Sequence, residues 1–332
     1  MQSSQENDSS VPKNNIPRLV TSFSRNMPAS TSSLGFGLIK NIFSEALEYK
    51  GIADGTRGAL LFLGVVTCMF ILVTILYQLD GSIKRPGLWG SHVILFIYTC
   101  VALPFGVYFF LKNLRLELFR PWDEPIIFDR KNRKVYRVFR EVIPGWRGLL
   151  KKWPLKCATY DWKLIDAEHH ASVVANTSAI SRLHALVFIV RRSTTDQNIE
   201  DSFTLGSGLL GEVSVPCVYE HIRKFMEDDG AHVPPGEIIS QITYPSTIWQ
   251  CLASVGPYGD NFKKLWHDHR IWLAVIIIFY PLLFFIMTPV GVFSWLSYKT
   301  AIPIRWPQEI MQAVGNPAEL ASMGSSSRHS TL

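Results

Sequence analysis

The sequence predicts an α+β membrane protein with three transmembrane helices, a hairpin plus one, and a β-rich domain inserted between the second helix and the third. The first observation is a pair of uncharged apolar runs, 59–79 and 88–111, separated by only eight residues. The second is another uncharged apolar run at 271–298. The third is the ordinary globular composition and single-domain length of the segment 112–270 between them.

Each apolar run is long enough to cross a bilayer as a helix. An α-helix rises about 1.5 Å per residue, so the 21 residues of the first run span a hydrocarbon core of roughly 30 Å. Because backbone groups in lipid must satisfy their own hydrogen bonds, a helix is expected for all three runs. Pro281 and Pro289 are expected to kink the third.

Lys and Arg residues near the ends of the runs predict the orientation. The segment 112–156, which begins where the second run ends, holds thirteen Lys or Arg against five Asp or Glu. The positive-inside rule then places the N-terminus and the β-rich domain in the cytoplasm, and the hairpin turn and the C-terminal tail outside. Candidate topology determinants or contacts to anionic lipid are Lys112, Arg115, Arg120, Arg130, Lys131, Arg133 and Lys134. Nucleic-acid binding is disfavoured, because the basic segment adjoins a span and lacks interleaved aromatic residues.

The N-terminal part, 1–57, is predicted to lie outside the folded domain. Residues 1–33 are rich in Ser, Asn and Gln, which predicts a disordered tail. In 36–49 the apolar residues Ile39, Ile42, Phe43, Ala46 and Leu47 recur at helical spacing. This pattern predicts a short amphipathic helix, either on the membrane surface or packed on the domain.

The middle part, 113–270, reads as β-strands closed by one helix. Two β-prone runs, 125–128 and 135–139, flank a polar turn and predict a hairpin. Further strand-like runs are 158–167, 172–176, 185–191 and 201–205. By analogy this is a small sheet or partly open barrel, pleckstrin-homology-like. Residues 231–262 look irregular. The hairpin of spans, 58–112, precedes this middle part, and the third span, 271–298, follows it. The tail 299–332 is predicted to hold one short helix from 308 to 314.

The closing helix is predicted from Ser214 onward, with Pro216 in its first turn and Gly230 as its end. Its apolar stripe, expected to face the core, comprises Val218, Ile222, Phe225 and Met226. Its polar face, expected to point to water, comprises Glu220, Arg223, Lys224 and Glu227.

No motif in the chain predicts catalysis or a bound cofactor. The glycines at 206, 208 and 211 match GxGxxG, but the helix begins after the motif, which favours a loop. His267 with His269, and His169 with His170, lack a fitting third ligand for a metal. We therefore predict a protein that is not an enzyme, with no cofactor and no metal.

The spans also disfavour transport, because all three runs lack Asp, Glu, Lys and Arg. Uncharged helices associate in lipid through small and weakly polar residues. Candidate helix-contact positions are Gly64, Thr67, Thr74, Gly106 and Gly291. Each of them could instead pack the protein's own helices together.

The segments 125–136 and 218–227, with the layout of two spans, a domain and a further span, resemble an uncharacterised family of bacterial inner-membrane proteins. Members are typically encoded beside type VI secretion effectors of the colicin-like, pore-forming kind. The resemblance implies a multi-pass inner-membrane immunity protein with a periplasmic tail, whose partners are a cognate toxin and membrane lipids. It carries over no catalytic residue.

A second interpretation stays open: a membrane-anchored sensor or adaptor whose β-rich domain binds a protein partner or anionic lipid. Immunity through the spans predicts that exchanging them for unrelated helices abolishes protection. The adaptor predicts that the domain alone retains binding.

Overall fold

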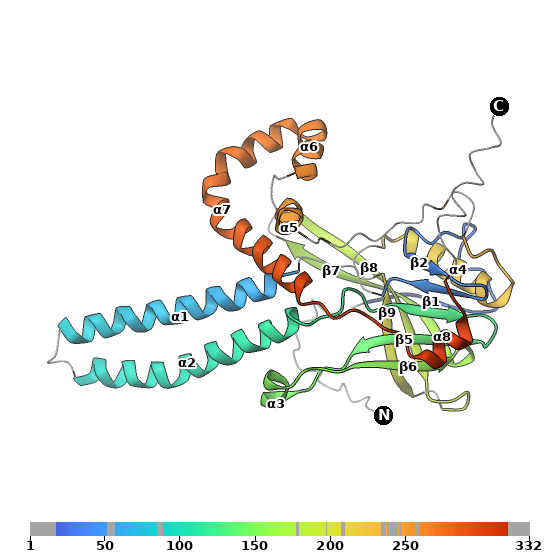
Figure 1. The fold of residues 1–332 in the computed structure, drawn as a ribbon, viewed down its shortest axis with the longest axis horizontal. Helices are drawn as coiled ribbons and strands as arrows, with labels where there is room; N and C mark the ends of the chain where they lie inside the picture. Colours follow the sequence, from blue (N-terminus) through green and yellow to red (C-terminus); the bar gives the residue numbers. More distant parts are fainter. Residues whose placement is uncertain are drawn as a thin grey trace, which may run out of the picture.

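The computed structural model describes residues 18–51, 57–84, 89–176, 179–196, 198–206, 210–233, 237, 245, 247–255 and 259–317. A helical hairpin projects from a domain built of two β-sheets, and a long bent helix arches away from the junction between them (Figure 1). The fold is mixed α+β, as predicted.

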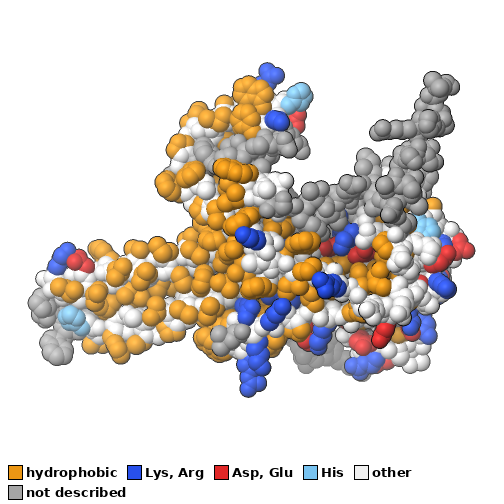
Figure 2. All heavy atoms as spheres, viewed as in Figure 1, with side chains coloured by type: hydrophobic (Ala, Val, Ile, Leu, Met, Phe, Trp, Pro, Cys, Tyr) orange, Lys and Arg blue, Asp and Glu red, His pale blue; other side chains and the backbone are white. Residues whose placement is uncertain are grey.

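The hairpin consists of α1 (Ala59–Lys84) and α2 (Trp89–Glu117). Within the described residues these two helices are long and apolar enough to cross a membrane, which confirms the pair of candidate spans. Only 17% and 6% of their most apolar stretches are buried inside the protein. Their outer surface is therefore almost wholly apolar, as Figure 2 shows along the length of the hairpin.

The larger sheet has five antiparallel strands in the order β2 (Ile39–Ile42), β3 (Ala46–Tyr49), β4 (Ile126–Asp129), β5 (Lys134–Arg140) and β6 (Leu155–Asp161). The predicted hairpin is confirmed as β4 and β5. β3 pairs with β4 although the whole of α1 and α2 lies between them in the sequence. The hairpin of α1 and α2 is thus an insertion between two neighbouring strands of one sheet.

The predicted amphipathic helix over 36–49 is wrong, because residues there form β2 and β3. Its apolar residues lie three or four positions apart, but a short turn between two four-residue strands produces the same spacing. All four residues of β3 are buried, so no polar alternation marked it as a strand.

The second sheet has the order β1 (Arg18–Phe23), β7 (Ile165–Asn176), β8 (Ala179–Arg191) and β9 (Ile199–Leu205), all antiparallel. The strand β1 corrects the predicted disorder of the tail from residue 18 onward, and residues 1–17 lie outside the described part. β1 is an exposed edge strand held by backbone pairing with β7, so it needs little apolar composition. The ring of Phe23 adds a stack on Tyr219, with centroids 4.8 Å apart.

The remaining strand predictions are confirmed with changed bounds. The run 158–167 is divided by a 3-10 turn (Trp162–Leu164) into the end of β6 and the start of β7. The runs 172–176, 185–191 and 201–205 lie within β7, β8 and β9. The likeness to a pleckstrin-homology fold stays a prediction.

The helix α4 (Ser214–Glu227) closes the main core, in which its apolar stripe packs with both sheets. The prediction that its polar face points to water is wrong for Glu220 and Arg223, which are 0% and 6% exposed. Two nitrogens of Arg223 donate to Glu220 at 3.0 and 2.8 Å. The amide of Ala29 donates to the same carboxylate at 2.9 Å, so the N-terminal segment covers this face of the helix.

Three helices lie between residues 248 and 299. α5 (Ile248–Val255) and α6 (Gly259–Asp268) correct the expected irregular structure of 231–262. α7 (Arg270–Lys299) is the third apolar helix, and its parts Leu273–Phe279 and Phe284–Lys299 are bent by 100° around the break that contains Pro281. It counts as a third candidate span only if this bent pair is taken as one.

The C-terminal helix α8 (Gln308–Val314) packs on the larger sheet. Ile310 and Val314 share a small buried cluster with Phe43, Ile127 and Tyr136. Residues from before the hairpin, after it and after α7 therefore meet in one core. The predicted placement of the tail across the membrane from the domain is incompatible with this packing, because a buried core cannot be split by a bilayer.

Candidate functional site: the membrane hairpin and its junction with the β domain

Small residues line the seam between α1 and α2. The thiol of Cys68 donates to the carbonyl of Gly106 at 3.3 Å, and a Cβ on Gly106 would lie 2.7 Å from Cδ1 of Ile71. A Cβ on Gly64 would lie 3.3 Å from the Cβ of Asn113 on the other helix. These close approaches are typical of helix pairs that associate in lipid.

The other candidate contact positions also serve the protein's own helices. The hydroxyl of Thr74 shares a hydrogen bond of 2.8 Å with the hydroxyl of Tyr98 across the seam. Thr67 donates to the carbonyl of Leu63 within α1 at 2.9 Å. A Cβ on Gly291 of α7 would lie 2.6 Å from Cδ2 of Leu252 in α5. The five positions therefore do not form one outward surface.

The outward surface of the hairpin consists of different residues, which sequence reasoning did not single out. Eight of them are large, apolar and exposed on more than one side of the hairpin, and we call these eight the outer face: Phe70, Val73, Tyr77, Ile94, Phe96, Ile97, Val101 and Phe105. The sequence indicates these residues only indirectly, because they lie on the sides of α1 and α2 that do not carry Gly64 and Gly106. Each of the eight is at least 56% exposed.

The ends of α1, α2 and α7 meet beneath the hairpin. The side chain of Glu117 accepts a hydrogen bond from the amide of Leu60 at 3.1 Å, which places a carboxylate at the N-terminus of α1. The hydroxyl of Ser297 donates to the carbonyl of Glu117 at 2.8 Å. Gly58 has a φ of +86°, and its backbone lies directly against Ser294 of α7.

Arg57 lies at the centre of this junction and is only 4% exposed. Its guanidinium lies 4.7 Å from the centre of the Tyr298 ring and donates to the carbonyl of Trp122 at 3.1 Å. The buried cation thus joins the residue before α1 to the chain after α2 and to the end of α7. Buried polar contacts therefore fix the start of α1, the end of α2 and the end of α7 to one another.

Arg140, the last residue of β5, caps the C-terminus of α2. One of its nitrogens donates to the carbonyl of Arg115 at 2.6 Å, and its guanidinium lies 4.4 Å from the ring centre of Trp153. Cations are favourable at this end of a helix. Burial, with the nearby charges of Arg115 and Arg120, lowers the pKa of Arg140 to about 10, so it stays protonated at neutral pH.

The seven candidate lipid contacts fall into two groups that the structure does not bring together. Lys112, Arg115 and Arg120 lie at the end of α2. The other four lie at the far end of β5, about 20 Å away at roughly 3.3 Å per residue. There Arg130 pairs with Glu45 at 2.6 Å and Arg133 pairs with Glu227, while Lys131 is exposed and Lys134 lines a groove.

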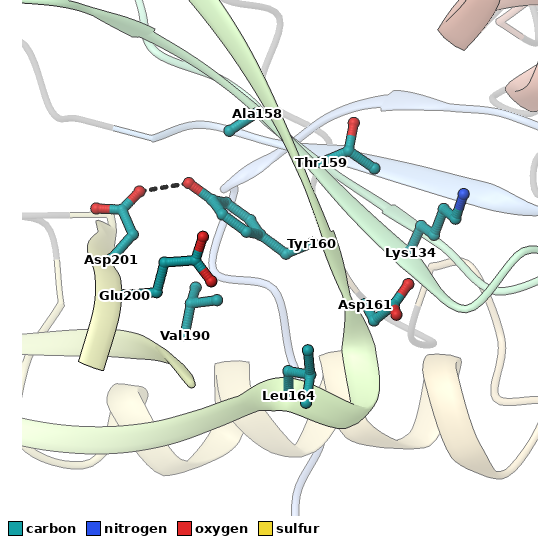
Figure 3. A pocket seen from close by; sticks show the side chains of 9 residues that line it. All are labelled: Lys134, Ala158, Thr159, Tyr160, Asp161, Leu164, Val190, Glu200 and Asp201. Carbon is teal, nitrogen blue, oxygen red and sulfur yellow. Dashed lines mark hydrogen bonds between the residues drawn. The ribbon is translucent and has the colours of Figure 1, made fainter. Parts of the chain in front are cut away.

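That groove, of about 680 Å³, lies between the edge strands β6 and β9 (Figure 3). The hydroxyl of Tyr160 donates to Asp201, and Arg137 pairs with the same carboxylate at 3.1 Å. Burial and the bond to Asp201 raise the pKa of Tyr160 well above its usual value, so the phenol is neutral. Asp161 and Glu200 are exposed at the groove and make it acidic.

The glycine-rich segment and the histidine pair of β7 do not form a cofactor or metal site among the described residues. The GxGxxG segment precedes α4 rather than entering it, and its residues 207–209 lie outside the described part. His169 is buried and shares a 2.9 Å hydrogen bond with His184, whereas His170 pairs with Glu168 on the other face of β7. Among the described residues, no group of three His, Cys, Asp or Glu could hold a metal ion.

Comparison with known proteins gives one match. The model of a family of unknown function (DUF6708) matches residues 103–315, which covers the second half of α2, the β domain from β4 onward and the helices up to α8. The chain has no match among curated proteins or among solved structures.

Proposed function

The chain belongs to DUF6708, a family of unknown function, and we propose that it is an inner-membrane immunity protein that neutralises a cognate pore-forming toxin by binding it within the bilayer. The observation that carries this proposal is the outer face, an uncovered apolar surface on a hairpin rigidly fixed to its domain. A pore-forming toxin must assemble helices in the membrane. An inhibitor that blocks this assembly must present helices in the same layer.

The chemistry of the hairpin suits this role better than transport or catalysis. The runs 59–79 and 88–111 hold no Asp, Glu, Lys or Arg, so association with another helix depends on packing and on hydrogen bonds of uncharged side chains. The seam residues Gly64 and Gly106 are used internally, which leaves the aromatic and β-branched outer face for a partner. The resemblance to proteins encoded beside type VI secretion effectors points to a colicin-like toxin as that partner.

The proposed topology differs from three simple crossings. Both ends of the hairpin return to one sheet, so α1 and α2 cross as a pair and the β domain lies on one side. The basic residues at the end of α2 favour the cytoplasmic side for that domain. The bent α7 then enters and leaves the membrane on that side, and the tail with α8 is cytoplasmic.

The proposal is tested in a bacterium that carries the gene, by growing a deletion strain in contact with its parent. The parent's secretion machine is either intact or disabled. We expect the deletion strain to die only beside the intact parent, and a plasmid copy of the gene to restore survival. Survival of the deletion strain beside a parent shown to be firing would reject immunity.

A variant of the outer face tests where the toxin binds. Phe70, Phe96 and Phe105 are changed to Leu together with Val73→Leu and Val101→Leu, which keeps the helices apolar but alters their shape. We expect normal amounts in the membrane and lost protection. The matched control changes the exposed residues Ile278 and Phe285 of α7 to Leu and should retain protection. Protection by the outer-face variant would move recognition to the β domain.

A membrane-anchored adaptor is the second candidate, and the acidic groove between β6 and β9 favours it. That groove offers exposed carboxylates to a basic segment of a cytoplasmic partner. The double variant Asp161→Asn, Glu200→Gln distinguishes the two functions. Immunity through the hairpin predicts that cells carrying this variant are fully protected. An adaptor acting through the groove predicts that these cells behave like cells in which the gene is deleted.

A further inference from the structure

The connection between β5 and β6, residues 141–153, contains a short helix that leaves the β domain and lies against the hairpin. This helix, α3 (Gly145–Leu150), is seen beside the domain end of α2 in Figure 1. The ring centroids of Trp146 and Tyr108 lie 4.9 Å apart, and the two rings pack edge to face. The Nε of Arg115 donates to the carbonyl of Leu149 at 2.9 Å. We call residues 141–153 the α3 tip.

The contact with Tyr108 sets the depth of the tip relative to a membrane. Tyr108 belongs to the uncharged run of α2, which ends at Leu111, and the first charge after it is Lys112. Trp146 therefore lies level with the last uncharged turn of a candidate span. If α2 crosses a bilayer, this is the boundary between hydrocarbon and headgroups, where Trp is typically found.

The front of the tip is apolar and exposed, while its back is packed. Trp146 is 64% exposed and Val142 is 60% exposed. On the other side Leu149 and Trp153 are buried, and the indole of Trp153 donates to the carbonyl of Gly148 at 2.8 Å. The exposed Trp146 is thus held on a folded element with a defined outer side.

The tip also carries three exposed cations, Arg147, Lys151 and Lys152, within six residues of Trp146 in the sequence. The acid at the base of the tip, Glu141, pairs with Lys156 at 2.7 Å. Figure 2 shows Lys and Arg side chains gathered where the hairpin meets the β domain, on the side where Figure 1 places α3. An exposed Trp framed by Lys and Arg at headgroup depth is the pattern of an interfacial anchor.

We propose that the α3 tip is a second membrane-contacting element, which inserts Trp146 and Val142 into the leaflet facing the β domain and binds anionic lipid headgroups through Arg147, Lys151 and Lys152. The partner is lipid because the tip continues the lipid-exposed surface of α2 at the same depth and carries the complementary charge. This proposal requires that α2 crosses the bilayer, but it does not require that the protein binds a toxin.

The depth of Trp146 is measured on the full chain in lipid nanodiscs, with all ten tryptophans replaced by 5-fluorotryptophan. The ¹⁹F signal that disappears in Trp146→Phe identifies the residue, and the other nine signals report whether the fold is kept. We expect a doxyl-labelled lipid to broaden this signal and a water-soluble gadolinium chelate to leave it sharp. The signal of Trp162, which is 1% exposed in the core, is the internal control.

Headgroup binding is measured on the same signal by comparing doxyl-labelled phosphatidylglycerol with doxyl-labelled phosphatidylcholine. We expect stronger broadening by the anionic lipid, and a fall of at least about fivefold in this preference in Lys151→Gln, Lys152→Gln, given roughly 1 kcal/mol per cation near an anionic surface. The matched control, Lys131→Gln with Lys163→Gln, removes two exposed lysines at the far end of the domain and should leave it unchanged.

Two results would overturn the proposal. Broadening of Trp146 by the gadolinium chelate, and not by the doxyl lipid, would place the tip in water and leave it as a surface for a soluble partner. Equal broadening by the two lipids in the unaltered protein, or an equal fall in both double variants, would reject headgroup binding by Lys151 and Lys152.

Discussion

Leu47 in β3 pairs with Phe128 in β4, although the entire α1–α2 hairpin lies between them in the sequence. At the end of this pairing the amide of Gly51 donates to the side chain of Asp123 at 3.1 Å. The two points where the chain leaves and re-enters the sheet are therefore adjacent. The α1–α2 hairpin occupies the position of a turn between two neighbouring strands.

This adjacency predicts that the hairpin is dispensable for the sheet. Replacing residues 52–122 by a short Gly-Ser linker should leave β3 and β4 paired, because a turn can connect antiparallel neighbours. In mild detergent, hydrogen exchange at the amides of Leu47 and Phe128 should remain slow. Rapid exchange there would show that the sheet depends on the hairpin, and adding Leu47→Asp supplies the unfolded reference.

The buried pair of Glu220 and Arg223 predicts a large effect of a small change. Glu220→Gln removes the buried charge that pairs with Arg223 and leaves only the half-exposed Asp228, at 2.9 Å, as its charged partner. It should lower the free energy of unfolding by about 3 kcal/mol, the lower end for breaking a buried pair. The matched change Glu141→Gln breaks an exposed pair with Lys156 and should cost less than about 1 kcal/mol. Denaturant unfolding in detergent measures both, and equal losses would contradict the role of burial.

Buried His221 predicts a pH dependence of stability. Burial lowers its pKa, and the ring shares hydrogen bonds with the hydroxyl of Tyr49 and the carbonyl of Ala231. The unfolded chain then binds a proton more readily, so the contribution is complete above the ordinary value of 6.5 and is lost as pH falls toward the folded pKa. The free energy of unfolding should therefore decrease below pH 6.5.

The variant His221→Gln isolates this contribution. It removes the titrating group, so the slope of unfolding free energy against pH should become shallower just below pH 6.5. An unchanged slope would assign the dependence to other groups, among them His169, whose pKa burial also lowers.

Gly58 predicts how tightly α7 is fixed to the hairpin. A Cβ there would lie 2.3 Å from the amide nitrogen of Ser294, and the φ of +86° is strained for any other residue. Gly58→Ala should destabilise the protein by about 2–4 kcal/mol and loosen α7. Thermal unfolding measures this loss. In α1, Gly81 has no atom within 4 Å of a built Cβ, so Gly81→Ala should not lower the melting temperature, and an equal loss in both variants would contradict the role of the contact at Gly58.

The sequence predicted best where one physical signal dominates. The uncharged runs determined α1 and α2, the polar turn between β-prone runs determined β4 and β5, and the apolar stripe of α4 determined which side faces the core. Each of these signals is local to its element. None of them depends on what another part of the chain contributes.

What escaped prediction depends on contacts between distant segments. β2 and β3 needed β4 from beyond the hairpin, and β1 needed the backbone of β7. Glu220 is buried because the segment around Ala29 covers α4. Among the small residues proposed as partner contacts, Gly64, Thr74 and Gly106 lie in the seam and Gly291 packs against α5, because glycines allow close approach where a neighbouring helix already lies. The residues of the outer face are the ones that these internal contacts leave available to a partner.

The most direct test of the proposed function is the membrane potential of recipient cells beside a firing parent strain, followed with a potential-sensitive dye. Recipients lack the gene, or carry it unaltered, or carry the outer-face variant. We expect depolarisation in the first and third and a maintained potential in the second. A maintained potential in recipients that lack the gene, beside a parent shown to be firing, would contradict protection against a pore.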